Sequence, residues 1–202
     1  MKRNKKWILA LTTVLCLSNM VACGKKEAKE ETYDGTKVET IQVTSDVNDI
    51  VFKKSQTDEI KLSIDGYEGN LANLNGDVLT IELPEEKGGV HIKKKPSLVI
   101  ELPDKAFASV QAKSEAGSIE VQKVDAKEMN VQSEYGDISI SGVSGEVVAD
   151  SDYGEIKTGA SIDADVSEKA DGQKEHLKGK IGTDAEGKNI TLKTGAGDIE
   201  IQ

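Results

Sequence analysis

The chain has 202 residues, of which 36 are acidic, 26 are basic and only 3% are aromatic, so its net charge at pH 7 is −10. Because phosphate contacts need a basic patch, this acidic balance predicts that the chain does not bind nucleic acid. The scarcity of aromatics also excludes a core built mainly of large rings. The composition favours a thin core of small, β-branched side chains, with turns made largely by the 19 glycines.

The first 22 residues have the features of a signal peptide. A basic segment at residues 2–6 precedes the apolar stretch "WILALTTVLCL" at 7–17, which is short for a membrane span. The following "MVAC" at 20–23 resembles a bacterial lipobox, with a small residue directly before the cysteine. This resemblance implies cleavage between Ala22 and Cys23 and a diacylglycerol with palmitate-type chains on Cys23. A plain signal peptide and an uncleaved anchor are the alternatives.

Cleavage at this site changes the charge and the chemistry of the chain that remains. Loss of residues 1–22 removes four positive charges and no negative one, which lowers the net charge from −10 to −14 and removes the only arginine, Arg3. An acidic chain is repelled by anionic lipids, so the acyl chains must hold it at the membrane. We expect it on the outer face of the cytoplasmic membrane of a Gram-positive cell, or on the outer membrane of a Gram-negative one.

Residues 23–35 are predicted to be the lipidated cysteine and a flexible tether, because "GKKEAKEET" at 24–32 is short and highly charged. Residues 36–202 are predicted to form one β-strand-repeat domain. Its first third is irregular: apolar and polar residues alternate over 59–67 and 77–83, which predicts strands, and Asn75–Gly76 predicts a tight turn. Residues 90–103 predict two more strands, separated at Pro96.

A twelve-residue pattern then recurs. It reads "VQAKSEAGSIEV" at 110–121, "MNVQSEYGDISI" at 129–140, "VVADSDYGEIKT" at 147–158 and "ITLKTGAGDIEI" at 190–201, with a weaker copy, "IQVTSDVNDIVF", at 41–52. Apolar residues alternate with polar ones on both sides of a central turn, so each copy predicts two half-buried strands. The fifth position is always Ser or Thr, and by parity its hydroxyl points inward, where it can bond the turn backbone.

The eighth position of the pattern is Gly or Asn, the residues that best tolerate positive φ, and we interpret it as a structural turn position. Its members are Asn48, Gly117, Gly136, Gly154 and Gly197. Two-strand units cannot bury their inward faces alone, and stacking them does so. The sequence therefore predicts an all-β fold, a β-solenoid of repeats of about 18–21 residues, with an antiparallel β-sandwich as the alternative. Residues 167–180 break the pattern and predict a loop or the end of a long hairpin.

The runs "LTIELP" and "LVIELP", the tandem "S-[DE]-[AY]-G-[DSE]-I" and the final "KIGTDAEGKNITLKTGAGDIEIQ" resemble the bacterial putative-adhesin family of β-strand-repeat domains. The resemblance covers roughly residues 36–202. It implies an envelope-associated solenoid of unknown function and no catalytic residues. Related domains occur in proteins linked to envelope stress, which implies an accessory role in stress sensing as an alternative.

The sequence shows no nucleophile motif, phosphate-binding loop or metal-ligand spacing, so we expect no enzyme, no metal site and no cofactor. An enzyme acting on envelope glycans is the least favoured alternative. The outward positions of the repeat are the candidates for surface contact: Tyr135 and Tyr153, and the carboxylates Asp137 and Glu155, where Ca²⁺ is an alternative to a solvated acidic face. We predict a membrane-anchored, adhesin-like binding or scaffolding module whose partner is an envelope protein or a polysaccharide.

Overall fold

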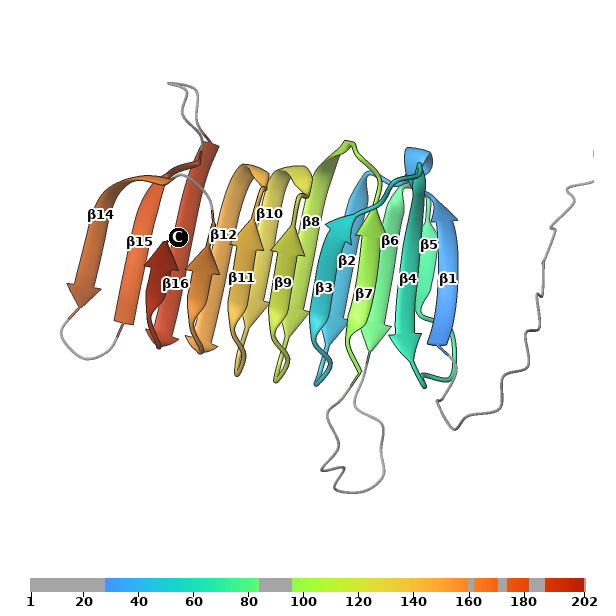
Figure 1. Ribbon diagram of the computed structural model, residues 1–202, viewed down its shortest axis with the longest axis horizontal. Helices are drawn as coiled ribbons and strands as arrows, with labels where there is room; N and C mark the ends of the chain where they lie inside the picture. The colour runs from blue at the N-terminus through green and yellow to red at the C-terminus, as the bar shows by residue number, and fades with distance from the viewer. Residues whose placement is uncertain (1–27, 84–95, 160–161, 171–173, 182–187, 202) are drawn as a thin grey trace, which may run out of the picture.

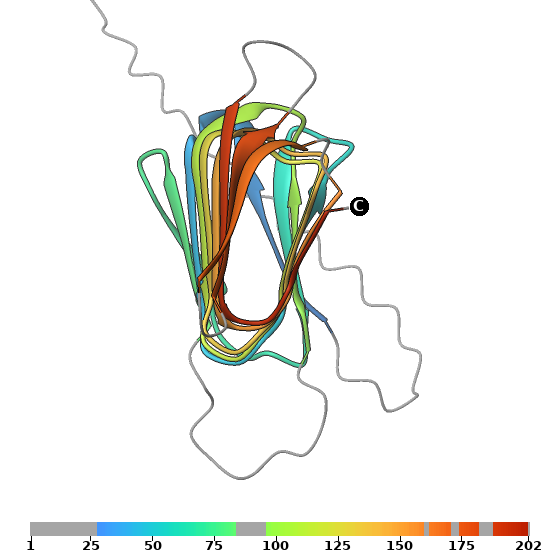
Figure 2. The same ribbon diagram turned by 90° about the vertical axis from the view of Figure 1, so that its left-hand side faces the viewer.

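The computed structural model describes residues 28–83, 96–159, 162–170, 174–181 and 188–201, and these form two β-sheets that face each other (Figures 1 and 2). The first sheet contains, in spatial order, β1 (Ala28–Asp34), β4 (Glu59–Asp65), β7 (Leu98–Leu102), β3 (Ile50–Lys54), β9 (Ile119–Gln122), β11 (Ile138–Ser141), β13 (Ile156–Thr158) and β17 (Ile199–Ile201). The second contains β14 (Ile162–Ala170), β15 (Lys174–Ile181), β16 (Lys188–Ala196), β12 (Ser144–Tyr153), β10 (Asp125–Ser133), β8 (Ala106–Ser114), β2 (Thr40–Ser45), β6 (Val78–Leu83) and β5 (Ala72–Asn75).

Each copy of the repeat contributes one strand to each sheet, and successive copies stack in parallel. We call such a pair of strands, with the turn that joins them, a rung. The fifth position of the repeat is in register throughout: Ser114 pairs with Ser45 and with Ser133, and Ser151 pairs with Ser133 and with Thr194. Parallel pairing between copies confirms the predicted solenoid and rejects the antiparallel sandwich.

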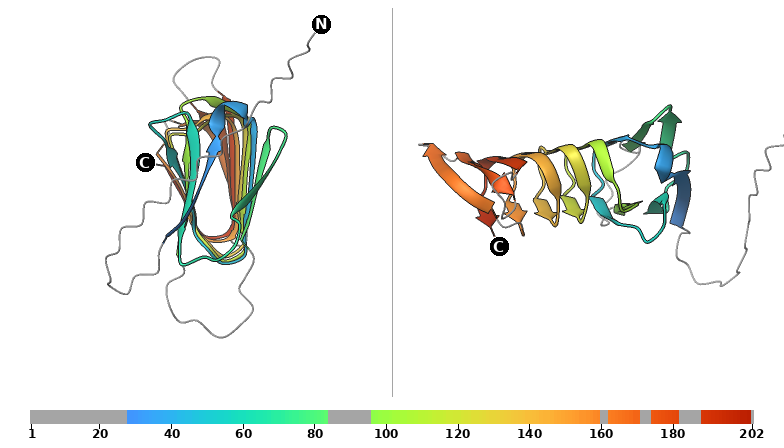
Figure 3. Two further views of the ribbon diagram at one scale, coloured as in Figure 1. Left: turned by 90° about the vertical axis from the view of Figure 1, so that its right-hand side faces the viewer. Right: turned by 90° about the horizontal axis from the view of Figure 1, so that it is seen from above.

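The order of the rungs in space differs from their order in the sequence. The rung β2–β3 stacks on β8–β9, although residues 41–52 and 110–121 are far apart in the chain. The rung β6–β7 lies on the other side of β2–β3, and the antiparallel strands β1, β4 and β5 complete that end (Figures 1 and 3). The described chain thus begins with β1 at the outer edge, enters the stack at β2–β3, and returns outward through β4 to β7 to complete the N-terminal cap. From β8–β9 onward it extends the stack in the other direction.

The opposite end carries an inserted hairpin. Strands β12 and β13 pair directly with β16 and β17, so the 43-residue interval between Gly154 and Gly197 contains no intervening rung. The antiparallel strands β14 and β15 instead extend the second sheet beyond β16. Of the two predictions for residues 167–180, a loop or the end of a long hairpin, this confirms the hairpin.

The predicted tether is too long. Strand β1 occupies Ala28–Asp34 and pairs with β4 along its whole length, with Tyr33 opposite Ile60. Its side chains alternate between half-buried and exposed, and Tyr33 packs against the core. The high charge of this segment concealed a period-two pattern because Lys29 and Glu31 occupy two of the half-buried positions, where they form an ion pair of 3.3 Å.

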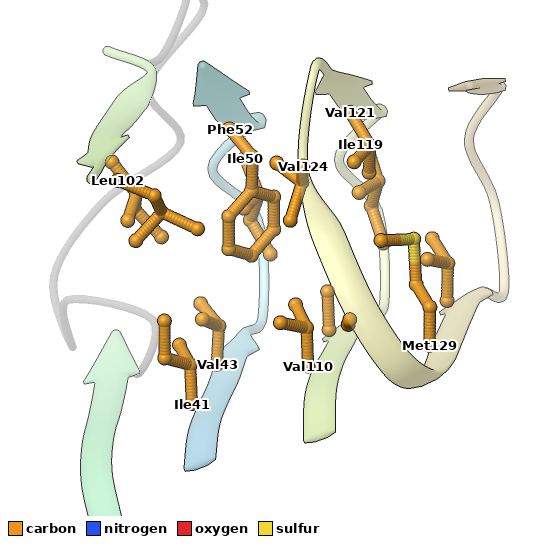
Figure 4. Packing of buried hydrophobic residues seen from close by; sticks show 14 of the residues in the cluster. Ile41, Val43, Ile50, Phe52, Leu102, Val110, Ile119, Val121, Val124 and Met129 are labelled. Atoms are coloured by element: carbon orange, nitrogen blue, oxygen red, sulfur yellow. The ribbon is translucent and has the colours of Figure 1, made fainter. Parts of the chain in front are cut away.

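The core is a row of aliphatic side chains from the two inner faces (Figure 4). Ile41, Val43 and Val110 extend from one sheet toward Ile50, Phe52, Ile119 and Val121 of the other, and all are buried. Phe52 and Phe107 are the buried rings among residues whose burial is described. This agrees with the thin, aromatic-poor core predicted from composition. No helix in the described part of the chain is long and apolar enough to cross a bilayer.

Candidate functional site: the turn edge of the stack

The turns at the centre of the repeats lie one above another along one side of the solenoid. We call this side the turn edge; it comprises residues 46–49, 115–118, 134–137, 152–155 and 195–198. Backbone bonds fix its register, since the amide nitrogens of Ala116, Tyr135 and Tyr153 donate to the carbonyls of Asp46, Glu115 and Glu134 in the preceding turn. The same position therefore recurs at every rung, about 4.8 Å from the next.

The glycines of the turn edge have a different role from the one predicted. Gly117, Gly136 and Gly154 do not have positive φ, and neither does Asn48; among the five predicted turn residues φ is positive at Gly197, where it is 155°. Glycine is required because the rungs touch: a Cβ on Gly136 would lie 2.7 Å from the carbonyl carbon of Gly117 and 2.8 Å from Ser133 Oγ. The positive-φ interpretation was wrong at four of the five positions, because the parallel stack, which the local pattern does not contain, brings each carbonyl against the next turn.

Asn48 occupies the same position with a side chain that bonds the neighbouring rung. Strands β6 and β7 are joined through residues 84–97, and the Asn48 Nδ2 donates to the Pro96 carbonyl at 2.9 Å. Its own carbonyl faces Gly117, as the other turn carbonyls face the glycine of the next rung. A side chain is tolerated here because it bonds the neighbouring rung instead of colliding with it.

A ladder of hydroxyls lies beneath the glycines, as the parity of the fifth position predicted. Ser45, Ser114, Ser133, Ser151 and Thr194 are all buried. The hydroxyls of the last three donate to the carbonyls of Gly117 at 3.2 Å, Gly136 at 3.0 Å and Gly154 at 2.9 Å. Each of these three hydroxyls thus satisfies a backbone acceptor of the preceding rung, which confirms the predicted bonding to the turn backbone.

The ninth-position carboxylates also bond from rung to rung. Asp137 Oδ1 accepts the Glu155 amide at 2.9 Å, and Asp49 Oδ1 accepts the Ser118 amide at 3.0 Å. Glu155 in turn pairs with Lys157 at 2.9 Å, and this hydrogen bond is the main reason that the pKa of Lys157 is raised. Asp137 and Glu155 are therefore compensated within the protein. No group of three or more His, Cys, Asp or Glu side chains that could hold a metal ion occurs among the described residues.

Tyr135 and Tyr153 are brought together as a stacked pair. Their ring centroids are 5.2 Å apart and their planes differ by 6°. The rings are 57% and 60% exposed, so they are the most exposed large hydrophobic residues whose burial is described. The negative charge of Glu134, followed by its hydrogen bond to the phenol, raises the pKa of Tyr135. Tyr135 therefore stays neutral at physiological pH, and the pair presents ring surface to solvent.

Sequence reasoning missed the contribution of the sixth position. Glu115, Glu134 and Asp152 are exposed beside the tyrosines, and Asp46 occupies the same position in the rung before them. The signal was present, since four of the five copies have an acid directly before the seventh position. Ala22 and Cys23, the predicted cleavage and lipidation residues, lie outside the described residues.

A family profile and the Clostridium sporogenes structure agree with this architecture. The profile of the Toastrack DUF4097 domain, a β-solenoid-like fold, matches residues 38–202. No curated protein matches the chain. A crystal structure of a "putative cell adhesion protein" from Clostridium sporogenes has 16% identity and a TM-score of 0.56, and the match covers 87% of this chain and 99% of that one. A "putative adhesin" from Bacteroides fragilis has 15% identity and a TM-score of 0.35, over 88% and 98% of the two chains.

Proposed function

The chain belongs to the Toastrack DUF4097 family, and from this premise we propose that it is an adhesin-like binding module anchored by lipid on the outer face of the cytoplasmic membrane. The observation that carries the binding role is the exposed Tyr135–Tyr153 stack on the turn edge. Rigid, exposed aromatic side chains are typical anchors of protein interfaces. The description of the Clostridium sporogenes structure as a "putative cell adhesion protein" supports the same role. The proposal includes no catalytic step.

The position of β1 supports a domain held close to the membrane. Only four residues separate Cys23 from Ala28, the first residue of β1, so a fully extended chain spans at most about 18 Å between them. Five strand spacings then separate β1 from β11 in the first sheet, which corresponds to about 24 Å along the stack. Under this proposal the cap lies next to the lipid and the tyrosine pair is displayed farther out.

Lipidation is tested by labelling bacteria that express the full chain with an alkyne analogue of palmitate. We expect label on the wild type and in its membrane fraction, no label on Cys23→Ala, and unchanged label on the matched control Cys16→Ala. Equal labelling of Cys23→Ala would reject the anchor.

Binding is tested by pelleting the purified full chain, held in nonionic detergent, with isolated bacterial envelopes. We expect Tyr135→Ala/Tyr153→Ala to reduce the pelleted fraction severalfold. The matched control is Leu74→Ala/Val148→Ala, which removes two other exposed apolar side chains and should leave pelleting unchanged. Equal losses in both variants would reject the tyrosine pair as the binding surface.

A further inference from the structure

The two tyrosines interrupt a column of smaller side chains. The seventh position of the repeat carries Val47, Ala116, Tyr135, Tyr153 and Ala196 in successive rungs. Tyr153 is in register with Ala196, and Tyr135 follows Ala116 through the backbone bonds of the turns. Each ring therefore stacks on the other through one face, and its second face lies opposite an alanine. An alanine methyl is too short to cover a phenol ring, so each outer face is open.

Negative charge predominates around these faces. The three turns 115–118, 134–137 and 152–155 contain five carboxylates and no lysine. Asp137 and Glu155 are compensated as described above, but Glu115, Glu134 and Asp152 form no ion pair with any residue that the structure describes. These three carboxylates lie at the sixth position, next to the tyrosine and alanine column, and are exposed.

We propose, building on the binding role above, that the outer faces of Tyr135 and Tyr153 bind arginine side chains of a partner polypeptide. A guanidinium placed over Ala116 stacks on the free face of Tyr135 and continues the column at its own spacing, since one rung is about 4.8 Å. Glu115 and Glu134 border that position and accept its N–H groups. Asp152 directly precedes Tyr153, as Glu134 precedes Tyr135, and it can accept the N–H groups of a guanidinium on the outer face of Tyr153.

The charge pattern favours this partner over the alternatives. An anionic polysaccharide is repelled by the carboxylates, and a neutral one leaves them without counter-charge. Arginine fits better than lysine because its flat guanidinium both stacks on a ring and bonds carboxylates in a fork. The partner is a different polypeptide, because Arg3 is the only arginine in this chain and it lies in the predicted signal peptide. A second copy therefore cannot supply the group.

The test measures fluorescence anisotropy of a labelled ten-residue peptide that alternates arginine and serine, titrated with the full chain in nonionic detergent at physiological salt. Matched peptides carry lysine or the neutral isostere citrulline in place of arginine. We expect the arginine peptide to bind about tenfold more tightly than the citrulline peptide and severalfold more tightly than the lysine peptide.

The protein variants distinguish the contribution of the tyrosine rings to binding from that of the three carboxylates. Tyr135→Ala/Tyr153→Ala retains every carboxylate and should weaken the arginine peptide about tenfold. Tyr135→Phe/Tyr153→Phe retains the ring faces and should bind within twofold of wild type. Glu115→Gln/Glu134→Gln/Asp152→Asn retains the tyrosines and should also weaken binding. Circular dichroism melting of each variant reports whether the stack is intact.

Two results would overturn the inference: unchanged arginine-peptide binding by a folded Tyr135→Ala/Tyr153→Ala variant, or equal affinity for the arginine and citrulline peptides. If envelope pelleting depends on the tyrosines but no peptide binds, the proposed binding function is supported, and its partner is not an arginine-bearing polypeptide. Competition of that pelleting by soluble envelope polysaccharide would assign a glycan instead. If neither pelleting nor peptide binding depends on the tyrosines, both proposals fail.

Discussion

The cap half of the stack (residues 28–102) and the repeat half (residues 106–201) bury different side chains behind the same two-sheet architecture. Six leucines are buried in the cap half, whereas Leu192 is the single buried leucine among the described side chains of the repeat half. Buried alanines show the reverse: Ala112, Ala126 and Ala149 all belong to the repeat half. The repeat half adds the glycine column, and it holds four of the five hydroxyls of the ladder, with Ser45 the one member in the cap half. Side-chain volume therefore stabilises the cap half, and close backbone stacking stabilises the repeat half.

The largest expected effect is a cavity in the cap half. Phe52→Ala removes a buried ring and should lower the free energy of unfolding by about 4 kcal/mol, whereas Val121→Ala, at the position of the repeat half that pairs with Phe52, should cost about 2 kcal/mol. Chemical denaturation of the two variants measures both values. Equal costs would show that the two cores are packed alike and would remove the first half of the comparison.

Next in size is the glycine column. Gly136→Ala should destabilise by about 3 kcal/mol, because its Cβ meets the Gly117 carbonyl. Gly136→Asn should be at least as harmful, because the cause is contact between rungs; a requirement for positive φ would make Asn milder than Ala. Gly159→Ala is the matched control, since its Cβ would lie an ordinary 3.5 Å from Ser141 Cβ. A Gly136→Ala variant with the same melting temperature as the wild type would falsify the stacking explanation.

The hydroxyl ladder should contribute less. Ser133→Ala removes the donor to the Gly117 carbonyl and leaves a buried acceptor unsatisfied, for an expected loss of about 1–2 kcal/mol. Ser139→Ala, at an exposed position of the same rung, should change stability by less than about 0.5 kcal/mol. If the two serines prove equivalent in denaturation, the ladder does not stabilise the repeat half.

The smallest effect is a pH dependence in the cap. Hydrogen bonds from Lys37 and from Thr36 lower the pKa of Asp34 to about 2, from an ordinary value of 3.8. Because the folded pKa is the lower one, this carboxylate stabilises the fold above pH 3.8, and its contribution is lost as the pH falls through 2. The wild type should therefore have a higher melting temperature than Asp34→Asn at pH 6, and the difference between the two melting temperatures should disappear near pH 2. A difference in melting temperature that is independent of pH would mean that the charge of Asp34 does not stabilise the fold.

Prediction from sequence succeeded where the information is local and repeated. Alternation over residues 110–158 identified the strands, and the parity of Ser133 and Ser151 placed their hydroxyls inside. It failed at β1, where Lys29 and Glu31 occupy half-buried positions that composition alone assigns to solvent. It also gave the wrong reason for Gly136, because the atom that excludes a side chain there belongs to Gly117, in another turn.

The two-strand unit, its turn, the apolar inner face and the need to stack can all be predicted from the sequence, because each depends on residues within one repeat. Which units are neighbours is seen only in the folded protein. Residues 41–52 lie against residues 110–121, the rung β6–β7 lies outside them, and the hairpin β14–β15 extends the second sheet instead of adding a rung. The physical reason is that every rung presents the same backbone hydrogen-bonding edge to its neighbours. The order of rungs therefore depends on how the cap and the inserted hairpin fit the two ends, which no single repeat encodes.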